Sequence, residues 1–321
     1  MLEIFGPVPS RRLGQSIGVN NIPPKNCTYA CVYCQLGKAL WMSTQRKAFY
    51  NPQNLACAAS EKVRLLMDQG IHLDYVTLVP DGEPTLDIHL LELMTYLKEI
   101  PVPLAVITNG SLLTDDNVTE ALLLADWISL KVDAYTENVW RKINRPCRDL
   151  QHTKLLKGMQ KFANRFHKKQ SGKLMTETML VEGINTDPAE QEAVADFIKT
   201  LHPQTAYLSI PTRPPAESWV KAATERSLTR TFVIFSERVP SVEYLIGYEG
   251  NAFIISGDAR EDILSITAVH PMREDAVSQL LLRNKADYSL VDTLLQEHLL
   301  IANTYQGNTY YVRSFSKNRG V

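Results

Sequence analysis

The 321-residue sequence predicts an α/β fold: a partial (β/α)6 TIM-like barrel followed by a small C-terminal winged-helix-like module. Short apolar runs alternate with amphipathic stretches, and this alternation produces parallel sheets with right-handed crossovers. Six such units are fewer than the eight of a closed barrel, so the barrel is expected to stay open on one side. Polar residues follow the apolar runs, at the strand ends where α/β folds hold their ligands.

The predicted strands are short and rich in β-branched residues, as buried parallel strands are. They span residues 15–22, 73–80, 104–110, 126–134, 173–183 and 205–211. Helical patterns between them span residues 55–70, 88–100, 114–125 and 187–201. Two of these helices have start signals in the sequence. Thr114 is a candidate N-cap, and Asp187 precedes Pro188 at a first helical position.

The alternation of predicted strands and helices ends after about residue 215. Residues 224–239 predict a last helix on the barrel, and residues 269–315 predict helix, turn, helix and a two-stranded hairpin turning at Gly307-Asn308. That order of elements is typical of a winged helix. We therefore expect a barrel core in residues 1–240, with its motifs within 15–215, and a linker with the winged-helix-like module in 241–321.

Composition excludes several classes of protein. With 45% hydrophobic and 21% charged residues the chain can bury a core, and its net charge of −1 argues against a protein that coats nucleic acid. The first 14 residues lack a signal peptide, and no apolar run approaches the roughly 18 residues of a membrane span. We expect a cytoplasmic protein without membrane contact, where structural disulfides are rare.

Three of the five cysteines lie within eight residues, Cys27, Cys31 and Cys34 of "CTYACVYC". Zinc usually takes four ligands in two spaced pairs, whereas Cys57 and Cys147 stand alone; a histidine could still complete a zinc site. A 4Fe–4S cluster also takes four thiolates. Three thiolates in one loop leave one iron without a protein ligand, and a substrate or cofactor can coordinate there.

The C-x3-C-x2-C loop after the first strand resembles that of the radical S-adenosylmethionine (radical SAM) superfamily, and the resemblance covers roughly residues 15–215. It implies one 4Fe–4S cluster on the three cysteines, with SAM chelating the open iron. It further implies reductive cleavage of SAM to a 5′-deoxyadenosyl radical that abstracts hydrogen from a substrate. An external one-electron reductant of flavodoxin or ferredoxin type is then expected as a partner.

Two further motifs match the superfamily in order. Tyr33, just before the third cysteine, is implied to lie against the adenine of SAM. The stretch "DGEPTL" (81–86) resembles the superfamily's G-G-E-P motif, whose backbone and acid meet the methionine amine. Gly82, Glu83 and Pro84 fit this motif, while Asp81 replaces its first glycine.

Strand ends supply the remaining candidate SAM contacts. Thr108 and Asn109 end the third predicted strand. Ser129, Lys131 and Asp133 alternate along the fourth, so they share one face. Each has an ordinary alternative: "TNG" as a turn, Asp133 as a helix N-cap, and Lys131 as an ion-pair partner of Glu177.

The segments 5–37 and 212–220 resemble a group related to wyosine-base synthases, which modify tRNA. The resemblance implies that those enzymes carry a second cluster on extra N-terminal cysteines. No cysteine precedes Cys27 here to hold such a cluster. Cys57 is expected in a helix core, and Cys147 is a candidate to face the cavity.

RNA or a nucleotide-like molecule is the expected substrate class. Against duplex binding, the helix predicted in 288–300 has two acids and neither Lys nor Arg. Arg11, Arg12 and Arg213 are candidates for an anion site at the barrel mouth, and the basic stretch 161–173 is a second candidate for phosphate contact. Two alternatives stay open: a peptide or small-molecule substrate, and a cluster-bearing redox sensor with a winged-helix output.

Overall fold

The computed structural model describes residues 3–169, 171–246, 258–269, 271–305 and 307–314. Its main sheet has eight strands in the order β1-β2-β5-β6-β7-β8-β9-β10. β1 pairs antiparallel with β2, and every later neighbour is parallel. The strands are β1 (Ile4–Ser10), β2 (Gly14–Val19), β5 (Tyr75–Leu78), β6 (Leu104–Thr108), β7 (Trp127–Lys131), β8 (Lys173–Met179), β9 (Thr205–Ser209) and β10 (Val242–Leu245).

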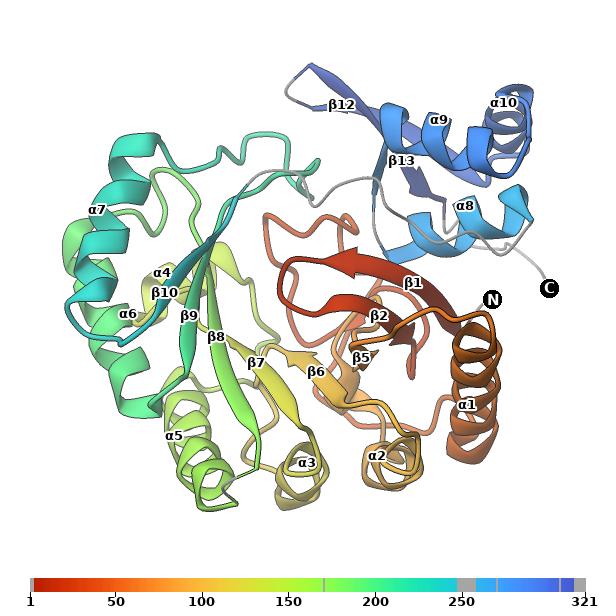
Figure 1. Ribbon diagram of the computed structural model, residues 1–321. Coiled ribbons are helices and arrows are strands. Elements are labelled where there is room, and N and C mark those ends of the chain that lie inside the picture. Colours follow the sequence, from red (N-terminus) through yellow and green to blue (C-terminus); the bar gives the residue numbers. More distant parts are fainter. Residues whose placement is uncertain (1–2, 170, 247–257, 270, 306, 315–321) are drawn as a thin grey trace.

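The predicted partial barrel is confirmed: β2 and β5 to β9 are the six expected strands, and Figure 1 shows the curved sheet open on the side between β1 and β10. β1 and β10 extend the sheet at its two edges and had not been predicted. β1 contains Pro7 and Pro9, which weaken a strand signal but are tolerated at a sheet edge. β10 has only four residues.

Helices cover the outer face of the sheet (Figure 1). They are α1 (Pro52–Asp68), α2 (Leu90–Leu97), α3 (Asp116–Leu122), α4 (Glu137–Ile143), α5 (His152–Lys168), α6 (Pro188–Leu201) and α7 (Glu225–Ser236), with a short 3-10 turn η1 (Pro84–Leu86). The Asp187 cap of α6 is confirmed, since its side chain accepts from two backbone N–H groups. The Thr114 prediction was wrong by one residue: Asp115 caps α3 and accepts from Asn117 N. None of the described helices is long and apolar enough to cross a membrane.

The inner face of the sheet is divided into two layers. Toward the start of the strands it is apolar and closed by Leu13, Ala105, Trp127, Met175 and Tyr207. Toward the strand ends the inward positions become polar, with Lys131 on β7, Glu177 on β8 and Ser209 on β9. These polar side chains line the base of a cavity at the strand ends.

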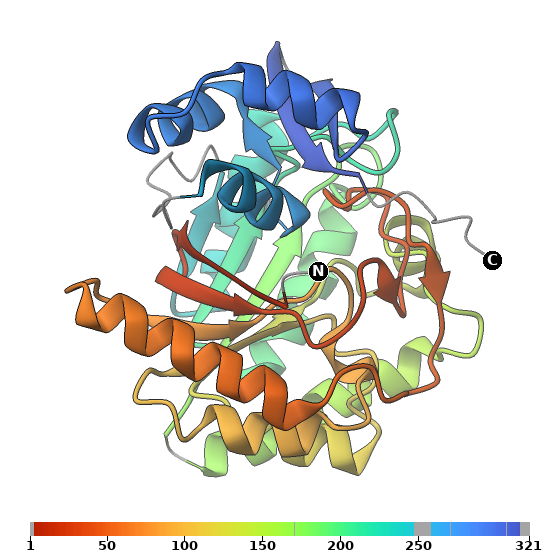
Figure 2. The same cartoon turned by 90° about the vertical axis from the view of Figure 1, so that its right-hand side faces the viewer.

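The C-terminal module contains α8 (Ala259–Val269), β11 (Met272–Arg273), α9 (Glu274–Arg283), α10 (Ser289–Gln296), β12 (Leu300–Tyr305) and β13 (Asn308–Arg313). The predicted helix–turn–helix and hairpin correspond to α9, α10 and β12–β13; α8 and β11 had not been predicted. Phe5 and Val8 of β1 belong to the module's apolar core, so the module packs on the edge of the barrel (Figure 2). The winged-helix assignment and the boundary at residue 240 stay predictions.

Candidate functional site

The three clustered cysteines lie in the segment between β2 and α1, where Cys27 ends the short strand β3 (Asn26–Cys27) and Cys31 and Cys34 follow in a loop; all three are partly buried. Two asparagine amides point at their sulfur atoms. Asn109 Nδ2 is 3.8 Å from Cys27 Sγ, and Asn144 Nδ2 is 3.4 Å from Cys31 Sγ. Hydrogen bonds to ligand sulfur stabilise thiolates and tune the potential of a bound cluster.

Burial raises the pKa of all three thiols, that of Cys31 to about 12. For Cys27 the nearby Glu83 carboxylate adds to this effect, and for Cys31 the Asp133 carboxylate does. Without a metal the thiols are therefore protonated at neutral pH. Binding of iron would release these protons, because thiolates are the metal-binding form.

The arrangement of potential ligands distinguishes the metal hypotheses. In the part of the chain that the structure describes, no three His, Cys, Asp or Glu side chains converge on one point as ligands of a single ion do. Zinc requires that convergence. A 4Fe–4S cubane places each thiolate on a different iron, so its ligands remain apart. The three thiolates of the cysteine segment match the donor set of a cubane with one open iron.

The "DGEPTL" motif follows β5 and lies directly against the cysteine loop. Lys25 N donates to Asp81 O at 2.6 Å, and Glu83 N donates to Asn26 O at 3.0 Å. A Cβ atom on Gly82 would lie 1.8 Å from Asn26 O. Glycine is therefore required at position 82 for the two loops to approach each other.

Glu83 is a buried acid whose donors are neutral. Its Oε1 accepts from Thr85 Oγ1 and Thr108 Oγ1, both at 2.6 Å, and its Oε2 accepts from Asn109 N at 2.8 Å. Burial raises the pKa of Glu83, and the hydrogen bonds from Thr108 and Thr85 oppose that rise. The carboxylate is held in a fixed orientation, and its donors in the described structure are neutral hydroxyl and N–H groups that do not compensate its negative charge. Such a group would bind an ammonium ion well.

Tyr33, Asp133 and Asn144 form a second buried group beside the cysteines. Tyr33 OH donates to Asp133 Oδ2, which also accepts from Asn144 Nδ2 at 2.7 Å. Asp133 Oδ1 accepts from Met179 N at 2.8 Å. The N-cap alternative for Asp133 was wrong, because Thr136 occupies that position of α4. Asn144 was missed from the sequence; no motif marks it, and only the fold brings it to Cys31.

Lys131 pairs with Glu177, as its alternative interpretation predicted, at 2.7 Å between Nζ and Oε1. Arg12 contacts the other carboxylate oxygen. Burial alone would raise the pKa of Glu177, but the two cations hold it at about 2. Lys131 also lies 5.2 Å from the centre of the Tyr33 ring. Ser129 is buried, and its hydroxyl has no hydrogen-bond partner among the described residues.

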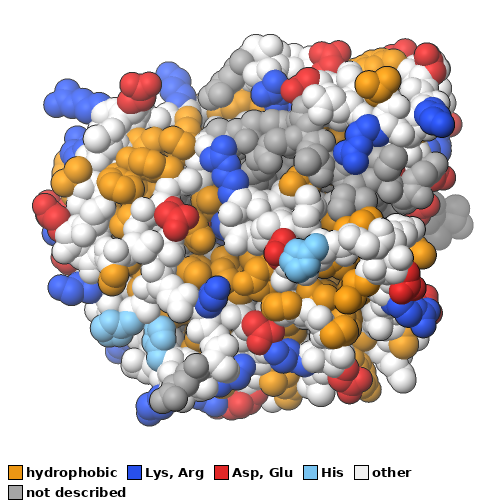
Figure 3. All heavy atoms as spheres, viewed as in Figure 1, with side chains coloured by type: hydrophobic (Ala, Val, Ile, Leu, Met, Phe, Trp, Pro, Cys, Tyr) orange, Lys and Arg blue, Asp and Glu red, His pale blue; other side chains and the backbone are white. Residues whose placement is uncertain are grey.

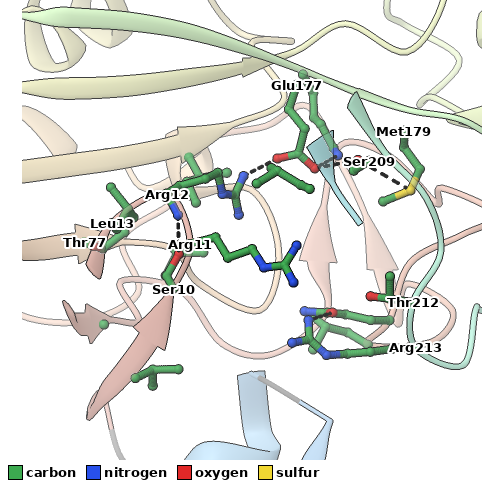
Figure 4. A pocket seen from close by; sticks show the side chains of 18 of the residues that line it. Ser10, Arg11, Arg12, Leu13, Thr77, Glu177, Met179, Ser209, Thr212 and Arg213 are labelled. Atoms are coloured by element: carbon green, nitrogen blue, oxygen red, sulfur yellow. Dashed lines mark hydrogen bonds and ion pairs between the residues drawn. The ribbon is translucent and has the colours of Figure 1, made fainter. Parts of the chain in front are cut away.

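A cavity of about 330 Å³ opens beside these groups. Tyr33, Cys34 and Lys131 line it on the side of the cysteine loop. The predicted anion cluster lines the same cavity, and Figure 4 shows these side chains: Arg11, Arg12 and Arg213. The other predicted site residues do not line this cavity: Cys27, Cys31, Gly82, Glu83, Pro84, Thr108, Asn109, Ser129 and Asp133.

The two remaining cysteines lie away from this cavity. Cys57 is exposed on α1, so its predicted place in the core was wrong; the buried face of that helix carries Leu55, Ala56 and Ala59. Cys147 is buried and lines a second, open pocket with Arg145 and other residues.

Asp81, which replaces the motif's first glycine, is only 1% exposed. Neither of its carboxylate oxygens has a hydrogen-bond partner in the described structure. Burial raises its pKa to about 8, against the opposing influence of Lys25 and Arg313. Arg313 belongs to β13, so the C-terminal module acts electrostatically on the motif.

Comparison with protein families matches residues 21–194 to the radical SAM superfamily. The UPF0026 protein MJ1312 of Methanocaldococcus jannaschii is 39% identical over 324 residues, covering 100% of this chain and 99% of that protein. A UPF0026 protein of Synechocystis is 32% identical over 66% of this chain and 76% of its own length. A GTPase Obg of Brachyspira hyodysenteriae is 30% identical over a region that covers 92% of this chain and 42% of that protein.

Two solved structures share the barrel. A radical SAM methyltransferase from Sphaerobacter thermophilus aligns with a TM-score of 0.53 and 15% identity, covering 72% of this chain and 67% of that one. Streptococcus suis SuiB bound to S-adenosylmethionine aligns with a TM-score of 0.52 and 14% identity, covering 72% and 51%. At these identities the likeness shows the shared fold alone.

Proposed function

This chain belongs to the radical SAM superfamily and is an enzyme of that type, and from this premise we propose that Cys27, Cys31 and Cys34 hold a single 4Fe–4S cluster. When reduced, the bound cluster supplies the electron that cleaves SAM to methionine and a 5′-deoxyadenosyl radical, which takes hydrogen from the substrate. The chain's own residues bind and orient SAM and keep water from the reaction.

Glu83 is proposed to receive the ammonium group of SAM. Its neutral donors fix both carboxylate oxygens, and it lies close enough to the cysteine loop to raise the pKa of Cys27. Gly82 and Pro84 shape the turn that carries it, and Thr108 and Asn109 hold it from β6. This buried, oriented acid beside the cysteines is the observation that carries the proposal.

Tyr33 is proposed to lie against the adenine, with Ser129, Lys131 and Asp133 completing the SAM site. The hydrogen bond from Tyr33 to Asp133 fixes the ring beside the cavity. Ser129 offers a buried hydroxyl that lacks a partner in the described structure. Lys131 is held by Glu177, and the pKa of Lys131 is raised: burial lowers it, but that carboxylate more than offsets the burial. It would therefore act as a fixed positive charge.

The test is EPR spectroscopy of the anaerobically reconstituted, reduced protein with and without SAM. SAM should change the cluster's spectrum, because its coordination alters the open iron. Glu83→Gln should keep the cluster and weaken SAM binding at least tenfold, since it removes a charge-assisted hydrogen bond. Glu120→Gln, an acid on α3 paired with Arg165, is the matched control and should bind SAM normally. An EPR spectrum of the cluster that is the same with and without SAM would favour the redox-sensor alternative.

Residues 144–148 contact the cysteine loop and also reach the surface. Ala30 N donates to Asn144 O at 3.1 Å, and Cys147 N donates to Thr28 O at 2.9 Å. Asn144 itself contacts Cys31 Sγ. This segment is therefore a short connection between the proposed cluster and the exterior.

We propose that an external reductant of flavodoxin or ferredoxin type docks on that segment. Arg145 and Arg148 are exposed there, and Trp41 of β4 (Trp41–Met42) is exposed on the adjoining loop. Arginines and aromatic side chains favour recognition of an acidic partner. The short distance to Cys31 would favour electron transfer from this side.

A further inference from the structure

The C-terminal module touches the wall of the cavity at three places. Phe5 and Val8 line the cavity from β1 and also belong to the module's apolar core. Val79, which follows β5 and lines the cavity, packs against the same core. The third contact is polar and lies at the loop after β9. The module therefore contacts parts of the cavity wall that are far apart in the sequence.

Two tyrosines of the β12–β13 hairpin donate to consecutive carbonyls of the loop after β9. Tyr305 OH donates to Pro211 O, and Tyr310 OH donates to Thr212 O, both at 3.1 Å. Pro211 and Thr212 line the cavity, as does the next residue, Arg213 (Figure 4). Burial raises the pKa of Tyr310, so its hydroxyl keeps the proton that it donates at neutral pH. The hairpin thus holds the backbone of the cavity wall from outside.

The loop after β9 also contacts the cysteine loop. Arg213 donates to Gln35 Oε1 at 2.7 Å, and Glu217 N donates to Val32 O at 3.1 Å. Val32 precedes Cys34 by two residues, and Gln35 directly follows it. The loop after β9 therefore connects the module's hairpin to the segment that is proposed to hold the cluster.

Helix–turn–helix modules commonly bind nucleic acid through a basic surface. In this module, α10 has Asp292 in its first turn and contains neither Lys nor Arg. On the face in Figure 3, the described side chains of the module include both acids and bases, interspersed. The contacts that the structure describes for the module are instead with the barrel.

We propose that Tyr305 and Tyr310 are positioning residues, which hold residues 210–213 in place as part of the wall that closes the cavity around the radical. The inference rests on the proposed function, since Tyr33 and Cys34 of the same lining are assigned to SAM and the cluster. A closed wall keeps water and small reductants from the reacting atoms. The module then shapes the cavity instead of recruiting a substrate.

The first test is hydrogen–deuterium exchange of the full-length protein, read by mass spectrometry, which needs neither cluster nor SAM. In Tyr310→Phe, peptides covering residues 210–217 should exchange about fivefold faster than in wild type, because a hydrogen bond that holds the loop is lost. The double variant Tyr305→Phe/Tyr310→Phe should show a larger increase.

Tyr288→Phe is the matched control for this test. It removes a hydroxyl that contacts Tyr311 and Glu274 inside the module, so exchange of residues 210–217 should match wild type. Unchanged exchange of the loop in the double variant would overturn the proposal. Faster exchange throughout the barrel would also overturn it, because the tyrosines would then stabilise the fold as a whole.

The second test measures access to the radical. Anaerobically reconstituted protein is mixed with SAM and dithionite in D2O containing 2-mercaptoethanol. A thiol that enters the cavity gives its S–D deuterium to the C5′ radical, so a C–D bond forms and a thiyl radical remains. The deuterated fraction of 5′-deoxyadenosine should be larger in the double variant than in wild type, and equal to wild type in Tyr288→Phe. This fraction is measured per molecule of product, so a loss of active protein does not change it.

The two tests separate failure of the inference from failure of the proposed function. A wild-type protein that forms no 5′-deoxyadenosine would reject the radical reaction, and hydrogen exchange would still show whether the tyrosines hold the loop. Faster exchange of the loop together with an unchanged deuterated fraction would overturn the inference, because the loop would then not close the cavity.

Discussion

The surroundings of Glu83 and the lining of the cavity are built in different ways. Glu83 is held by neutral donors from its own turn and from the end of β6, all within 26 residues of it. In the cavity, Arg11 and Arg213 come from segments about 200 residues apart. The chemistry shared by a superfamily therefore resides in short motifs, whereas the lining of the cavity depends on the placement of distant segments.

The first prediction concerns the thiolate ligands of the proposed cluster. Cys31→Ala should abolish the cluster, because two thiolates do not hold a cubane stably. Cys57→Ala should leave it intact, since Cys57 is exposed on α1. Iron and acid-labile sulfide analysis of anaerobic protein measures both. A full complement of iron and sulfide in Cys31→Ala would show that the ligand assignment is wrong.

Removal of Glu177 should destabilise the fold. Glu177→Gln leaves Arg12 and Lys131, both partly buried, without their shared counter-charge, which should lower the free energy of unfolding by about 3 kcal/mol at pH 7. Urea unfolding measures this effect.

The sign of the pH dependence follows from the lowered pKa of Glu177. The ion pair stabilises the folded wild type above the usual glutamate pKa of 4.5, and this stability is lost as the pH falls toward about 2. The difference between wild type and Glu177→Gln should therefore shrink below pH 4.5. A difference that stays constant down to pH 3 would contradict the ion-pair explanation.

A smaller effect is expected at the proposed reductant surface. Reversing the charge at Arg145 and Arg148 should slow reduction of the cluster by an acidic flavodoxin about tenfold, because rim charges govern association rates. Reduction by dithionite, a small molecule, should be unchanged. Stopped-flow absorbance measures both rates. Equal flavodoxin rates in wild type and variant would place the docking surface elsewhere.

A second pH-dependent effect is expected at Asp81. Its raised pKa means that the folded state loses stability as the pH rises from about 4 to about 8, because a buried carboxylate must become charged. Asp81→Asn should therefore be more stable than wild type at pH 9, by roughly 5 kcal/mol for a pKa shift from 3.8 to about 8, and equal to it near pH 4. Thermal unfolding at both pH values measures this. Greater stability of the wild type at pH 9 would show that Asp81 has a charged partner in the folded protein.

The sequence predicted the parts of this site that depend on local spacing. The cysteine loop, the "DGEPTL" motif and the six inner strands follow from short patterns whose residues lie close together in the chain. It also named Arg11, Arg12 and Arg213 as one group, from their charge and from their positions near strand ends. The structure places all three in the lining of one cavity.

Other features depend on contacts between distant segments and could not be predicted. Asn144 approaches Cys31 across 113 residues, and nothing in its neighbourhood marks it. The contact of Arg12 with Glu177 spans 165 residues. Cys57 was misplaced because the helical pattern has apolar neighbours on both sides of it, and only the packing of α1 decides which face is buried.

The central claim is tested most directly by measuring 5′-deoxyadenosine and methionine after the anaerobic protein is mixed with SAM and dithionite. We expect wild type and the control variant Arg165→Gln to form the two products in equal amounts, even slowly without substrate, and Cys31→Ala to form neither. A wild-type protein that holds the cluster, binds SAM and yet forms no 5′-deoxyadenosine above the level of Cys31→Ala would contradict it.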